Sequence, residues 1–172
     1  MSEIVNRVAK SPIVTIDLEE FYVEGERLSF DLGEHLYQGL VLREKDFRES
    51  LKNLDWEIYR DKLVAVYCSV DAIVPSWAYM LVMTYLQGVA REVVVGDLAA
   101  LDQFLFQKSL QAIDPADYCD RPVVVKGCSK RSVPLYAYGE VVKILMGSAR
   151  SIMYGEPCST VPIYKKPKPV KQ

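Results

Sequence analysis

Short apolar segments alternate with longer segments of helix length through most of the chain, and this alternation limits the fold more than any other feature. The longer segments lie at residues 76–90, 98–113 and 134–146, and Pro75 and Asp97 precede the first two as residues that favour helix starts. Such alternation predicts βαβ units, and therefore an α/β fold with a parallel sheet and helices on both faces. The sheet should have about four strands, formed by the valine-rich segments at residues 63–67, 93–95, 123–125 and 151–154.

The first 60 residues follow a different pattern. Residues 13–16 and 27–30 predict two short strands, and the Glu24-Gly25 turn between them favours a hairpin. Residues 44–54 have apolar residues at helical spacing. We therefore expect three parts: an N-terminal β-hairpin and helix extension at 1–60, an α/β domain at 61–163, and a flexible Lys/Pro tail at 164–172.

Composition excludes several classes of protein. The chain has 172 residues and a net charge of −2, so no strong positive field attracts nucleic acid. It has no apolar stretch of about 20 residues that could span a membrane, and its start does not resemble a secretory signal. We expect a cytoplasmic protein, whose four cysteines are thiols or metal ligands rather than disulfides.

A local pattern occurs three times. A Cys-Ser pair is followed by a short spacer, a Val-Pro pair, any residue and an aromatic residue. Cys119 does not fit this pattern. Prolines are too rare for chance to explain three such copies well. The copies begin at Cys68, Cys128 and Cys158 and reach Trp77, Tyr136 and Tyr164.

Each of these three cysteines follows a predicted strand, and ligands of open α/β sheets bind where parallel strands end. If the thiols converge, the strands take the order 2-1-3-4, numbered along the chain. Cys68, Cys128 and Cys158 would then bind a metal, with Asp71 as fourth ligand or as catalytic acid/base. Zinc is the first expectation and a four-iron iron–sulfur cluster the second. Two alternatives remain open: chemistry by the thiols themselves, and simple packing of small apolar residues.

Several segments resemble an uncharacterised bacterial family, the domain of unknown function number 2480. They are Cys68–Met80, Lys126–Cys128, Ser151–Pro162 and the opening segment Ile4–Ala9, so the resemblance covers almost the whole chain. It implies a bacterial cytoplasmic protein. It implies no reaction, so the metal hypothesis depends on the three loops alone.

Two classes of function follow from these observations. The first is a small enzyme that depends on a metal or a cluster. The second is a non-catalytic binding module, in which the cysteines hold the loops or only fill the core. Both leave open an unknown small-molecule ligand and a homo-oligomer, and neither involves nucleic acid or a membrane.

Overall fold

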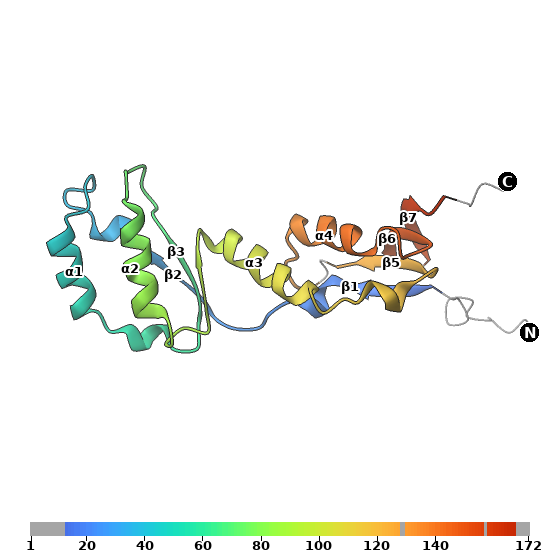
Figure 1. The fold of residues 1–172 in the computed structure, drawn as a ribbon, viewed down its shortest axis with the longest axis horizontal. Helices are drawn as coiled ribbons and strands as arrows, with labels where there is room; N and C mark the ends of the chain where they lie inside the picture. Colours follow the sequence, from blue (N-terminus) through green and yellow to red (C-terminus); the bar gives the residue numbers. More distant parts are fainter. Residues whose placement is uncertain (1–12, 128–129, 157, 168–172) are drawn as a thin grey trace, which may run out of the picture. The chain divides into compact units, whose positions relative to one another are not determined.

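The computed structural model describes residues 13–127, 130–156 and 158–167 (Figure 1). The chain divides into two compact units. Unit 2 is the continuous segment Glu24–Phe104, and unit 1 combines Met1–Val23 with Leu105–Gln172. The predicted domain boundary at residue 60 therefore falls inside unit 2.

Unit 2 contains a parallel three-stranded sheet with the order β2-β3-β4. Two helices connect its strands, and short 3-10 helices follow β2 and precede β3. The elements in chain order are β2 (Arg27–Asp31), η2 (Leu32–His35), α1 (Glu44–Asn53), η3 (Trp56–Tyr59), β3 (Leu63–Tyr67), α2 (Ser76–Leu86) and β4 (Glu92–Val95).

Both connecting helices of unit 2 lie on the same face of its sheet. Alternate strand residues, Phe30, Val64 and Val66, form one buried cluster with Phe47 of α1 and Val82 of α2. This is the expected result of two right-handed crossovers in a sheet whose strands follow one another in chain order.

Helix α3 (Leu98–Leu110) begins against the other face of this sheet. Arg27 points to that face because it alternates with Leu28 and Phe30, which pack with the cluster. Its Nε lies 2.8 Å from Oδ1 of Asp102, on the second turn of α3. The first turns of α3 therefore lie on the face of the sheet opposite α1 and α2, and they run toward β2.

Unit 1 has a four-stranded sheet with the order β1-β5-β6-β7. The first three strands are parallel, and β7 forms an antiparallel hairpin with β6. Its core joins Ile16 and Val125 of the sheet to Phe106 of α3 and Val141 of α4. The elements are β1 (Val14–Asp17), η1 (Leu18–Phe21), the end of α3, η4 (Pro115–Tyr118), β5 (Pro122–Lys126), α4 (Leu135–Leu145), β6 (Ser151–Glu156) and β7 (Ser159–Lys165).

The two units are structural copies of each other. Helix α2 begins at Ser76 and α4 at Leu135, which are 59 residues apart, and the same spacing relates η3 to η4, β3 to β5 and the start of β4 to the start of β6. Positions 59 residues apart are called equivalent below. The end of α3 is the counterpart of α1, because its fully buried Phe106 and Leu110 are equivalent to Phe47 and Leu51.

The copies also share an unusual turn before the central strand. Asp61 and Asp120, which are equivalent, both have a left-handed backbone, with φ of 59° and 53°. The backbone N–H of Asp61 donates to the carbonyl of Val89, and that of Asp120 donates to the carbonyl of Ser148. Aspartate tolerates this conformation better than most residues. In both units, the same hydrogen bond therefore links the turn before the central strand to the segment that follows the next helix.

The α/β class and the parallel strands are confirmed, but the predicted single sheet with order 2-1-3-4 is wrong. The segments predicted as strands one and two belong to unit 2, and those predicted as strands three and four belong to unit 1. The two N-terminal strands do not form a hairpin either. Instead, β1 pairs with β5 and β2 pairs with β3, because each sheet takes its first strand from the N-terminal region.

The three loop copies are not alike in the structure. Val74-Pro75 and Val133-Pro134 occupy equivalent places, directly before α2 and α4. Val161-Pro162 lies inside β7 instead. The third copy is therefore a hairpin strand and not a loop that leads into a helix.

Candidate functional site

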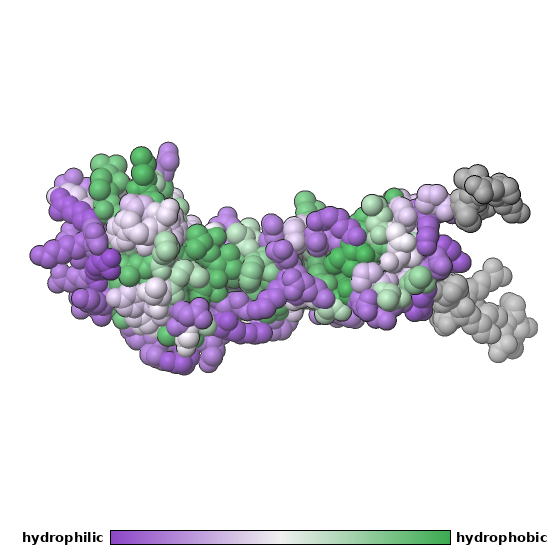
Figure 2. Space-filling model, in the orientation of Figure 1, coloured by the Kyte–Doolittle hydropathy of each residue, from purple (hydrophilic) through white to green (hydrophobic). Residues whose placement is uncertain are grey.

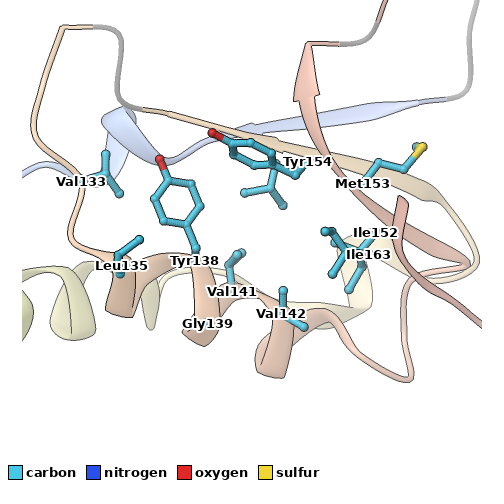
Figure 3. Close-up of a pocket in the computed structure, with 11 residues that line it drawn as sticks. Val133, Leu135, Tyr138, Gly139, Val141, Val142, Ile152, Met153, Tyr154 and Ile163 are labelled. Atoms are coloured by element: carbon cyan, nitrogen blue, oxygen red, sulfur yellow. The ribbon is translucent and has the colours of Figure 1, made fainter. Parts of the chain in front are cut away.

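Unit 1 contains a cavity of about 490 Å³ between helix α4 and the sheet (Figure 3). The helix forms one wall, and strands β5, β6 and β7 form the other. Figure 2 shows apolar surface over α4 and the adjacent strands of this unit. The walls include Leu135, Gly139 and Val142 from α4, Ile152 and Tyr154 from β6, and Ile163 from β7.

Two tyrosines mark one end of the cavity. The rings of Tyr138 and Tyr154 meet edge to face, with centroids 5.8 Å apart. Figure 3 shows both hydroxyl groups at the same end of the otherwise apolar space. Gly127 helps to place one of them, because a Cβ added there would lie 3.2 Å from the Tyr138 hydroxyl oxygen and 3.1 Å from Cβ of Leu18.

Gly139 is an unexpected residue in the middle of helix α4. A glycine in a helix interior costs about 0.5–1 kcal/mol relative to alanine. Close packing does not explain its presence, because a Cβ added there would meet nothing within 4 Å. The equivalent residue in unit 2 is Met80, and the equivalent of Val142 is Met83. The α4 wall therefore has small residues at the two positions where its copy carries long ones.

The predicted metal ligands lie in different parts of the chain. Cys68 follows β3 in unit 2, and its Sγ donates a hydrogen bond of 3.4 Å to the carbonyl of Val70. Asp71 is exposed in the same loop. Cys158 and Cys119 are exposed in unit 1. Cys128 lies outside the described residues.

The structure gives no support to a metal site. Within the described part of the chain, no group of three or more His, Cys, Asp or Glu residues is placed to hold an ion. Convergence of the thiols also requires that the strands before Cys68 and Cys128 share one sheet edge, but β3 and β5 belong to different sheets. Zinc or a four-iron cluster at Cys68, Cys128 and Cys158 stays a prediction, which the metal content of anaerobically purified protein measures directly.

An aspartate lies at the C-terminal end of the first strand of each unit, Asp17 in β1 and Asp31 in β2. Oδ1 of Asp31 accepts hydrogen bonds from the backbone N–H groups of Gly33 and Ser69, at 2.8 and 2.9 Å, and so joins the end of β2 to the end of β3. Partial burial opposes ionisation, but the hydrogen bonds from Ser69 and Gly33 outweigh it and lower the pKa of Asp31 below its ordinary value. This carboxylate holds the strand ends in place.

Unit 1 has a related contact at the same edge. The carboxylate of Asp17 lies 3.2 Å from the ammonium group of Lys126, its neighbour across the β1–β5 pair. A hydrogen bond to Asp17 raises the pKa of Lys126, and the charges of Asp17, Glu156 and Glu19 act in the same direction. Lys126 therefore keeps its charge and links the end of β5 to the end of β1.

The residue patterns of the sequence did not point to the cavity. Its walls come from α4 and from strands whose pairing is not encoded locally. The single available signal was Gly139, an isolated glycine in an apolar helical segment, which often has a packing or functional reason.

Comparison with known proteins gives the family of the chain. Among the described residues, no helix is both long and apolar enough to cross a membrane. Neither the curated proteins nor the solved structures contain a significant match. Residues 2–166 match a family described as proteins of unknown function, DUF2480. This match spans nearly the whole chain, so the protein belongs to the DUF2480 family.

Proposed function

We propose that the protein is a binding module whose unit 1 cavity holds a small, mainly apolar molecule. The observation that carries this proposal is the cavity itself, about 490 Å³ of space beside a helix that has a glycine where no packing requires one. Ligand pockets in proteins commonly have volumes of about 300–1,000 Å³ and mostly apolar walls.

The walls define the chemistry of the ligand. Aliphatic side chains such as Leu135, Val142, Ile152 and Ile163 favour an apolar body, since burying apolar surface contributes about 25 cal/mol per Å². The hydroxyl groups of Tyr138 and Tyr154 favour a polar group at one end of the ligand. The described lining residues include no carboxylate, imidazole or thiol, so the chemistry that this cavity offers is binding.

Titration of the full chain with a neutral apolar fluorophore, 1-N-phenylnaphthylamine, tests the proposal. Fluorescence should rise to saturation with wild-type protein. The double variant Gly139→Met/Val142→Met gives unit 1 the side chains that unit 2 has at the equivalent positions, and it should lower the affinity at least tenfold. Thr84→Met is the matched control, because it adds the same side chain to an exposed position of α2, outside the cavity.

Two results would contradict the proposal. One is fluorescence that rises without saturation in the wild type, as expected for weak adsorption to the surface. The other is equal affinity in the wild type and in the double variant, provided that the circular dichroism spectra of the two proteins agree.

A further inference from the structure

The polar end of the unit 1 cavity lies at the edge of the sheet where β5 ends. A Cβ added at Gly127, directly after β5, would lie 3.2 Å from the hydroxyl oxygen of Tyr138. Figure 3 shows the hydroxyls of Tyr138 and Tyr154 at this end, and Ile152 and Ile163 toward the other. A ligand with one polar group therefore places that group at this edge, and its apolar body points toward the isoleucines.

Among the residues that the structure describes, no charged side chain lines the cavity. Lys126, the cation of β5, points to the face of the strand opposite Val125, which is a lining residue. Its ammonium nitrogen also lies 3.2 Å from Oδ2 of Asp17. Lys126 therefore pairs with a carboxylate of the protein on the far face of the sheet and does not serve the cavity.

The loop between β5 and α4 also keeps its cations outside the cavity. The guanidinium carbon of Arg131 lies over the ring of Tyr22, 5.0 Å from its centroid, and neither residue lines the cavity. Lys130 is exposed to solvent. An ionised headgroup of either sign would therefore meet no counter-ion on the described walls, and burying an unpaired charge is costly.

Carboxylates of the protein already surround this edge. The hydrogen bond to Asp17 and the charges of Asp17, Glu156 and Glu19 all raise the pKa of Lys126, so these three carboxylates lie near the end of β5. They would repel a further carboxylate that a ligand brought to the same edge. The phenol hydroxyls of Tyr138 and Tyr154, by contrast, can both donate to and accept from an uncharged group.

We propose that the ligand of this cavity is an uncharged amphiphile of the long-chain alcohol type, whose hydroxyl group contacts those of Tyr138 and Tyr154. The inference rests on the proposed function and adds to it the charge and the orientation of the ligand. An alcohol both donates and accepts, as the two phenols do. Its aliphatic chain lies along the apolar walls toward Ile152 and Ile163.

Displacement of bound 1-N-phenylnaphthylamine from the full chain tests this ligand class. The three competitors 1-decanol, sodium decanoate and decyltrimethylammonium bromide have similar chains and differ in the charge of the headgroup. 1-Decanol should displace the fluorophore at a concentration at least tenfold below that of either ion. If the fluorophore binds and either ion displaces it as well as 1-decanol does, this inference is wrong and the proposed function stands. If the fluorophore does not bind saturably, both are wrong.

The double variant Tyr138→Phe/Tyr154→Phe tests the position of the headgroup. It removes both hydroxyls and keeps both rings, so the affinity for 1-decanol relative to that for the fluorophore should fall about fivefold. Tyr79→Phe is the matched control, because Tyr79 is equivalent to Tyr138 but belongs to unit 2, and its affinity ratio should equal that of the wild type. An unchanged ratio in the double variant, or the same fall in the control, overturns the proposal.

Discussion

His35 has the most unusual setting of any titratable side chain in unit 2. Its ring stacks on Phe30 with centroids 5.1 Å apart and 4° between the ring planes, and it meets the edge of Phe47. Its Nδ1 lies 2.9 Å from the hydroxyl oxygen of Ser50. Burial lowers the pKa of His35 below its ordinary value, although the nearby carboxylates of Glu34 and Asp31 act in the opposite direction.

This shift predicts a pH-dependent stability. Because the pKa of His35 is lower in the folded protein than in the unfolded chain, the unfolded chain takes up a proton first as the pH falls. The contribution of neutral His35 is complete above about pH 6.5, the ordinary value for histidine, and is lost as the pH falls toward the folded pKa. The free energy of unfolding, measured with urea from pH 7.5 to pH 5, should therefore decrease.

The variant His35→Phe isolates this effect. Phe21 stands at the corresponding last position of η1 in unit 1, so an aromatic ring without a titrating group suits this turn. The variant should remove most of the fall in stability between pH 7 and pH 5. If wild type and variant lose stability in parallel over that range, the pH dependence arises from other groups.

At the scale of elements, helix α4 contains a residue that lowers its own stability. Gly139→Ala should raise the free energy of unfolding by about 0.5–1 kcal/mol, because alanine is the better helix former and its Cβ has open space. Urea unfolding measures the change. Gly147→Ala is the control: its Cβ also meets nothing, but its φ is +95°, so the substitution should lower stability. A loss of stability in Gly139→Ala would show that the backbone at this position needs glycine.

The helices and strands themselves were predictable from sequence. The segment predicted as a helix at 98–113 forms α3 (Leu98–Leu110), and the one at 134–146 forms α4 (Leu135–Leu145). The segment predicted at 76–90 ends early, at Leu86: Gln87 is already extended, and Gly88 follows it with a φ of +82°. Local signals of apolar spacing, proline and glycine determine these elements, so a single sequence is enough to find them.

The pairing of the strands was not predictable in the same way. The Glu24-Gly25 turn favoured a hairpin, yet Arg27 pairs with Leu63, and Val14 pairs with Val123. These partners are far apart along the chain, and no local pattern marks them. The candidate site was missed for the same reason, since β5, β6, β7 and α4 must assemble before the cavity exists.

The repeated cysteine loops mark the duplication of the chain, and the structure does not bring their thiols together in one sheet. Two of the copies reflect the duplication, as Val74-Pro75 and Val133-Pro134 are equivalent. Their cysteines are not: Cys68 is equivalent to Gly127, and Cys128 to Ser69. The repeated feature is the proline that starts the second helix of each unit, and the thiols do not follow the repeat.

At the scale of the whole molecule, the two copies are connected unequally. Unit 2 is one continuous segment, whereas unit 1 takes β1 from one end of the chain and its other elements from the opposite end. Every strand pair of unit 2 joins residues within Arg27–Val95. Contacts between distant segments cost more chain entropy, so unit 2 can form first, without waiting for unit 1.

This asymmetry predicts that unit 2 folds by itself. A fragment of residues 24–110 retains the whole buried cluster of unit 2 and the complete helix α3, so it should show one cooperative urea transition by circular dichroism. A fragment of residues 105–172 lacks β1 and with it the buried side chains of Ile16 and Leu18, so it should show no cooperative transition. Phe47→Ala in the 24–110 fragment removes a fully buried ring worth about 3–5 kcal/mol and should abolish its transition. If the 24–110 fragment does not fold while the full chain does, unit 2 depends on unit 1, and the duplication has produced two parts of a single cooperative domain.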